Sequence, residues 1–112
     1  MSSFERGLEI AAKLEAEGLR ATVDPRGATP PCVLVVPPGR VYDLGCGYTA
    51  SWSLIVLAPG TGNADAWKLL DEMCDQVAGV VDVRGADFIS YALSPDNPTH
   101  PAYRITFEEA LS

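Results

Sequence analysis

Hydrophobic residues near the start of the chain recur at helical spacing. They stand three or four positions apart and are Phe4, Leu8, Ala11 and Leu14. Ser2 opens an S-x-x-E capping box before this run, and Gly18 supplies a left-handed stop after it. We therefore predict a helix over residues 3–17 with this stripe in the core. Glu9 and Lys13 stand four residues apart on its outer face, which indicates a solvated surface with an ion pair.

Two segments that follow have the composition of β-strands. Residues 20–24 alternate polar and apolar positions, as an edge strand does, and then enter an Asp-Pro-Arg-Gly turn. Residues 32–36 read CVLVV and are apolar on both faces, which indicates a central strand. Proline pairs bracket this run, and proline cannot join the interior of a ladder, so we expect the strand to end at Val36. The next stretch, residues 37–47, is long for a hairpin turn and is expected to protrude.

Residues 48–58 predict a long strand with two different faces. One face is hydrophobic throughout and is expected to lie against the helices: Tyr48, Ala50, Trp52, Leu54, Val56 and Ala58. The other face begins with hydroxyl side chains and ends with apolar ones: Thr49, Ser51, Ser53, Ile55 and Leu57. The apolar half of this second face needs cover. A partner subunit and a neighbouring loop of the same chain are both open as its source.

The stretch LAPGTGNADAW, residues 57–67, raises the question of a phosphate-binding loop. Aligned on the second glycine of a P-loop, it has leucine, asparagine and alanine where glycine, lysine and a hydroxyl belong. The dinucleotide pattern G-x-G-x-x-G fits its two glycines but meets Asp65 at the third, where an acid would repel a pyrophosphate. We interpret the stretch as a turn that leads into a helix cap, and we expect no bound cofactor.

A second helix is predicted to begin at a cap, Asn63 or Asp65, and to end at Gly79. Its apolar stripe is Trp67, Leu70, Cys74 and Val77, with acidic residues on the opposite side. We interpret Trp67 as a core residue.

Two more strands are predicted over residues 88–93 and 102–107, with a turn-rich loop between them. The element order is therefore helix, three strands, helix, two strands. Short links between consecutive strands favour a mainly antiparallel sheet of four to five strands with two helices packed on one face, an α+β fold. The 112 residues, 47% of them hydrophobic, fit a single domain over residues 1–112.

The charge balance limits the kind of partner. The formal net charge is -7, with 15 acidic against 8 basic residues, and no basic cluster is present. Affinity for nucleic acid depends on lysine and arginine at the phosphates, so specific nucleic-acid binding is not expected. Neither a secretory signal nor an apolar run long enough to span a membrane is expected in the sequence.

The residue types that carry catalysis are sparse. His100 is the only histidine, and its neighbours Thr99 and Pro101 indicate a loop position. The three cysteines are widely spaced and fit reduced thiols that pack as small apolar residues: Cys32, Cys46 and Cys74. No C-x-x-C and no G-x-S-x-G occurs. We therefore assign no catalytic, cofactor-binding or metal-binding residue and expect a protein that is not an enzyme.

The order of these segments points to a family. The segments that carry it are ATVDPRGATPPCVLVVPP, LAPGTGNADAWKLLDEMCDQV and NPTHPAYRITFEEAL. With the helix before them, they resemble the small tail terminator proteins of long-tailed bacteriophages, most like those of phages infecting actinobacteria. The similarity extends over nearly the whole chain, and residues 24–38 and 101–106 are its most specific parts.

The resemblance implies an α+β fold and a homohexameric ring that caps the tail tube. Such a ring stops tube polymerisation and provides the surface for the head-side connector, while DNA passes through its channel. It implies a virion protein at the tail–neck junction, assembled in the cytoplasm of the bacterial host, with a tail tube protein and a connector or stopper as partners. Acidic residues around the channel would let DNA slide without adhesion.

Candidate subunit or lumen contacts follow from this hypothesis. They are Arg40, Tyr42 and Asp43 in the expected protruding segment, and Thr49, Ser51, Ser53, Ile55 and Leu57 on the second face of the long strand. Two alternatives remain open. One is a head–tail connector or stopper of the phage neck, and the other is a small host enzyme or ligand-binding α+β domain with a cleft near residues 45–47.

Overall fold

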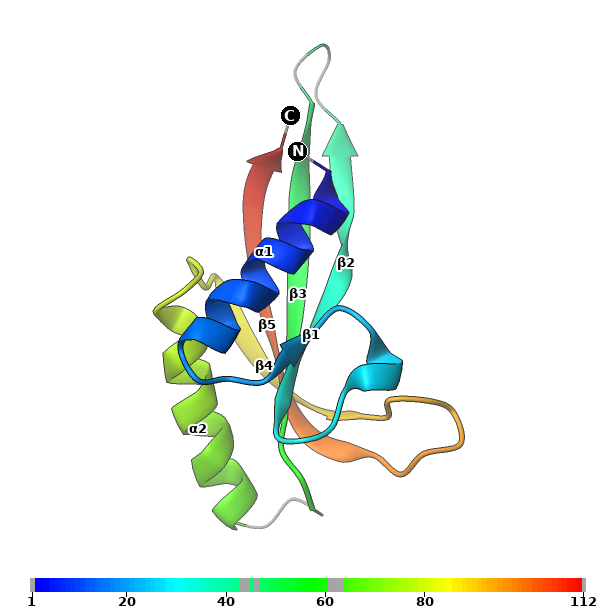
Figure 1. Ribbon diagram of the computed structural model, residues 1–112, viewed down its shortest axis with the longest axis vertical. Coiled ribbons are helices and arrows are strands. Elements are labelled where there is room, and N and C mark those ends of the chain that lie inside the picture. Colours follow the sequence, from blue (N-terminus) through cyan, green and yellow to red (C-terminus); the bar gives the residue numbers. More distant parts are fainter. Residues whose placement is uncertain (1, 43–44, 46, 61–63, 112) are drawn as a thin grey trace.

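The computed structural model describes residues 2–42, 45, 47–60 and 64–111. This part of the chain forms two α-helices and a five-stranded sheet (Figure 1). The elements are α1 (Ser3–Ala16), β1 (Ala21–Thr22), the 3₁₀ turn η1 (Pro25–Gly27), β2 (Cys32–Tyr42), β3 (Tyr48–Leu57), α2 (Ala64–Ala78), β4 (Gly85–Tyr91) and β5 (His100–Leu111). The strand order is β1-β2-β3-β5-β4, and every neighbouring pair is antiparallel except β1 with β2. The predicted α+β class is confirmed, with a mixed sheet.

Helix α1 has the predicted cap but a different buried face. The Ser2 hydroxyl accepts a hydrogen bond from the backbone N–H of Glu5 at 3.0 Å, and Gly18 has a φ of 89° beyond the helix end. The buried positions are Gly7, Ile10, Ala11 and Leu14. Phe4 and Leu8 are exposed, so the first half of the predicted stripe is wrong. Both sets have helical spacing, and periodicity alone does not distinguish them.

Strand β2 continues through the prolines that were expected to end it. The register with β3 shifts by one residue between Val36 and Gly39, so Pro37 and Pro38 together stand opposite Trp52. A bulge of this kind leaves the two prolines outside the regular ladder, so the N–H groups that they lack are not needed there. The predicted end at Val36 is therefore wrong.

The β2–β3 hairpin extends along the longest dimension of the molecule, which is 48 Å (Figure 1). The segment 37–47, expected as a protruding loop, is strand as far as Tyr42, and residues 43, 44 and 46 lie outside the described part. Beyond the two positions where β1 pairs with β2, the outer edge of β2 pairs with no other strand in the described residues.

Strand β3 divides the core into two clusters. Its predicted helix-facing residues pack with both helices, and Trp52 stacks on Phe107 of β5 with ring centroids 6.1 Å apart. On the other face, a smaller cluster consists of Cys32, Leu34, Ile55, Leu57 and Ala102. Partly buried residues of the same chain pack against it, among them Ala28, Tyr91 and Leu93. The cover of this apolar half-face therefore comes from the chain itself.

Helix α2 buries Ala66, Leu70, Met73 and Val77. Trp67 is 65% exposed, so its prediction as a core residue is wrong. The helix begins at Ala64, which places Asp65 in the first turn, and the alternative cap Asn63 lies outside the described residues. The last two strands occur as predicted, but β4 is shifted toward the N-terminus and β5 is longer at both ends.

Candidate functional site

The predicted contact residues that the structure describes fall into three groups. Arg40 and Tyr42 lie on the helix-facing side of the hairpin, because they pair with Ala50 and Tyr48. The hydroxyl residues of β3 lie on the opposite side and are exposed or half-exposed: Thr49, Ser51 and Ser53. Ile55 and Leu57 are buried in the smaller cluster and are not part of the surface. Asp43 lies outside the described residues.

Arg40 links the hairpin to the first turn of α1. Its Nη1 donates a hydrogen bond to the Tyr42 hydroxyl at 3.2 Å, and its Nη2 donates to the Ser3 hydroxyl at 3.2 Å. The guanidinium carbon lies 4.5 Å from the centroid of the Tyr48 ring. The bond to Tyr42 raises the pKa of Arg40 above its ordinary value. All these partners are uncharged, so an exposed positive charge is held in place without a carboxylate among the described residues.

An apolar cleft opens next to this arginine, between α1 and β2. We call it the α1–β2 cleft, and its lining includes Phe4, Gly7, Val35, Pro37, Pro38 and Trp52. Ser3, the partner of Arg40, also lines it, so Arg40 stands at its rim. Its volume is about 260 Å³. No local sequence pattern indicates the cleft, because its wall depends on the bulge at the two prolines.

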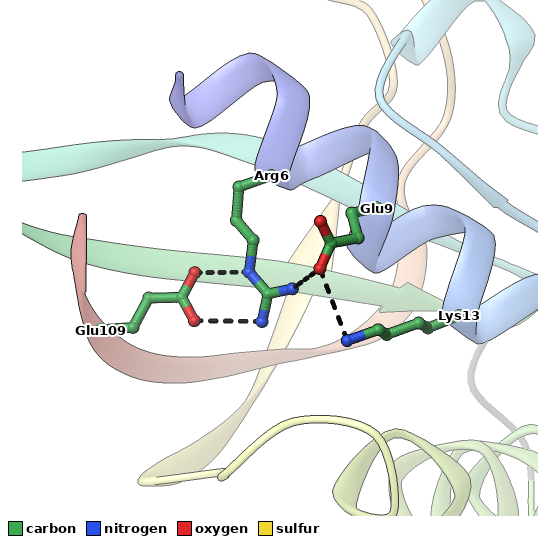
Figure 2. Close-up of polar contacts among 4 residues, drawn as sticks. All are labelled: Arg6, Glu9, Lys13 and Glu109. Atoms are coloured by element: carbon green, nitrogen blue, oxygen red, sulfur yellow. Dashed lines mark hydrogen bonds and ion pairs between the residues drawn. The ribbon is translucent and has the colours of Figure 1, made fainter. Parts of the chain in front are cut away.

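Figure 2 shows a cluster of ion pairs that joins α1 to the end of β5. Arg6 binds Glu109 with two hydrogen bonds, from Nε to Oε1 at 2.7 Å and from Nη2 to Oε2 at 3.1 Å. Its Nη1 also contacts Glu9 at 2.6 Å, and Lys13 lies 3.5 Å from the same carboxylate. The predicted pairing of Glu9 with Lys13 is confirmed. The Arg6–Glu109 pair was not predicted, because 103 positions separate the two residues.

The outer half of the second sheet face forms a row of short side chains. Ser51 lies beside Glu108 of β5, and Ser53 lies beside Thr106. On the other side Ser51 faces Gly39, where an added Cβ would lie 3.9 Å from the Ser51 Cβ. Glu108 and Arg104 of β5 are exposed on the same face, so the short side chains of β3 lie next to charged residues.

Histidine and cysteine side chains are dispersed. His100 is the first residue of β5 instead of a loop residue, and its buried Nδ1 has no hydrogen-bond partner among the described residues. Burial raises the pKa of the Cys32 thiol, and it raises that of Cys74 to about 11, with the neighbouring aspartates adding to the effect. Cys46 lies outside the described residues. The described residues hold no group of three or more potential ligands arranged for a metal ion.

Several large apolar side chains remain on the surface. They are Phe4, Leu8, Val41, Tyr42, Trp67 and Phe88. Phe88 contacts Tyr103 edge to face, with centroids 5.8 Å apart. The exposure of Trp67 was not predicted, although Asp71, one turn later on the same helix face, was a signal for it.

Searches for similar proteins gave no match among protein-family models, curated proteins or solved structures. Neither described helix is long and apolar enough to cross a membrane. The main surface features of the described residues are the α1–β2 cleft, Arg40 and the exposed aromatic residues.

Proposed function

We propose that this chain is a structural virion protein that forms a ring and caps the tail tube of a long-tailed phage. The ring ends tube polymerisation and offers the joining surface to the head-side connector at the tail–neck junction. The observation that carries the proposal is the exposure of large apolar side chains, together with an open apolar cleft that one of them, Phe4, lines, on a small acidic domain. Such surfaces are typical of proteins that bury them against partners.

Two further features support it. The α+β fold, with both helices on one sheet face, agrees with the fold that the resemblance to tail terminators implies. The net charge of -7 fits a channel that DNA traverses without adhesion, since like charge repels the phosphates. The hydroxyl row of β3 (Thr49, Ser51 and Ser53) is a candidate lining of that channel or a contact with a neighbouring copy.

The test is to mix the purified chain with the tail tube protein of the same genome and to image the tubes by negative stain. We expect a cap of extra density at one end of each tube, and an equal amount of an unrelated acidic domain should leave the ends unchanged. Tubes that never carry the chain, although it binds the head-side connector, would assign it the stopper role instead. Salt-dependent capture of the chain on duplex DNA would contradict the proposed channel.

A further inference from the structure

The α1–β2 cleft has the size of one large side chain. At about 260 Å³ it is smaller than the roughly 300–1,000 Å³ of pockets that hold drug-sized ligands. Its lining is apolar, with the buried Trp52 and two prolines among its residues. An aromatic side chain that enters such a site buries on the order of 150–250 Å². The cleft is therefore shaped for an apolar anchor with little polar chemistry of its own.

The same chain carries an anchor of this kind in the first turn of α2. Trp67 is 65% exposed, and it has no aromatic or cation–π partner among the described residues. Phe88 is almost as exposed, but its ring already packs against Tyr103. Tryptophan is also among the residue types enriched at the energetic centre of protein interfaces.

Charge complementarity selects a second copy of this chain as the occupant. Asp71 follows Trp67 by four residues, so the two side chains are neighbours on the surface of α2. Neither Asp71 nor Arg40 forms an ion pair within the described residues. Arg40 stands at the rim of the cleft. Trp67 with the Asp71 carboxylate beside it therefore complements the apolar cleft with the Arg40 guanidinium beside it.

Trp67 cannot fill the cleft of its own chain. The C-terminal ends of α1 and α2 meet, where Gln76 Nε2 donates to the Glu17 carbonyl at 3.4 Å. From there the two helices diverge, and their first turns lie at opposite ends of the molecule (Figure 1). The anchor is in the first turn of α2, and the cleft is at the first turn of α1. The contact must therefore join two copies.

We propose that Trp67 of one copy inserts into the α1–β2 cleft of the next, where Asp71 pairs with Arg40. This contact rests on the proposed ring and names the surfaces that build it. It is a head-to-tail contact, because it joins two different surfaces of the same chain. Contacts of this type close into a ring when the rotation between copies permits, and they grow into filaments otherwise.

Sedimentation equilibrium of the purified chain and its variants tests this contact. We expect the wild type to self-associate and Trp67→Ala to weaken association by at least about tenfold. Phe88→Ala is the matched control, since it removes a similarly exposed aromatic residue and should associate like the wild type. Circular dichroism should show an unchanged fold for Trp67→Ala, because this side chain is mostly exposed.

Charge reversal supplies the specific readout. Arg40→Asp and Asp71→Arg should each weaken association, and the double variant should recover most of it. A wild-type chain that stays monomeric at the highest concentration overturns the contact, as does Trp67→Ala that associates normally or a double variant without recovery. The tube-capping test is independent of these results. Caps formed by Trp67→Ala would reject this contact and keep the proposed function. A wild-type chain that self-associates through this contact but forms no caps would keep the contact and reject the proposed function.

Discussion

Replacement of Leu57 by alanine tests whether the second sheet face belongs to the core of this chain. Leu57 is fully buried on β3, in the smaller cluster that strand and loop residues of the same chain cover. Truncation of a buried leucine costs about 2–5 kcal/mol, depending on how far the site collapses. The cover here includes partly buried loop residues that can relax, so we expect about 2–4 kcal/mol. At about 4 °C per kcal/mol for a domain of this size, the melting temperature should fall by about 8–16 °C.

The assay is urea unfolding followed by circular dichroism, with thermal melting as a second measure. Ser51→Ala is the matched control, because Ser51 lies on the same face of the same strand but is exposed. It should change the free energy of unfolding by no more than about 0.5 kcal/mol. The opposite result, a Leu57→Ala variant that keeps wild-type stability and loses self-association, would place a partner subunit over this face.

Three smaller perturbations test other parts of the structure. Glu109→Gln should lower the free energy of unfolding by about 1–2 kcal/mol, because it removes one charge of a pair whose side chains are only 18% and 24% exposed. The outer Glu9→Gln should cost at most about 0.5 kcal/mol, and equal effects would contradict a stabilising Arg6–Glu109 pair. Gly7→Ala should raise stability by about 0.5–1 kcal/mol, because the added Cβ meets its neighbours at an ordinary 3.7–3.8 Å, and a lower melting temperature would show that α1 packs closer than described. Cys74 holds its proton to about pH 11 in the folded chain against 9.0 for an ordinary thiol, so stability should fall as the pH rises through this range. By site-resolved mass spectrometry at pH 8, its alkylation should be about a hundredfold slower than in the urea-unfolded chain, and equal rates would contradict the burial.

Local patterns in the sequence were sufficient for the fold class. The capping residue Ser2 and the stop at Gly18 define α1, and the alternation along β3 separates its helix-facing side from the other. These signals are local, because they depend on residues within one or two turns of each other. The pairing of Glu9 with Lys13 was predictable for the same reason.

Features that depend on the tertiary arrangement were not predictable. The rotation of α1 that exposes Phe4 is set by the fit of the helix to the sheet, and either apolar stripe satisfies the periodicity. The bulge at Pro37 preserves a strand that the proline rule would have ended. The α1–β2 cleft follows from both, so no local pattern indicates it. The exposure of Trp67 likewise depends on which face of α2 meets β3 and β5.

Growth of the tail tube tests most directly whether the chain ends a tube by assembling on it. Tubes are first incubated with the chain, and labelled tube protein is then added while their lengths are followed by microscopy. We predict that the capped end of each tube gains no labelled protein, so that any growth occurs at the other end. Equal growth at both ends, with and without the chain, would contradict the proposed function.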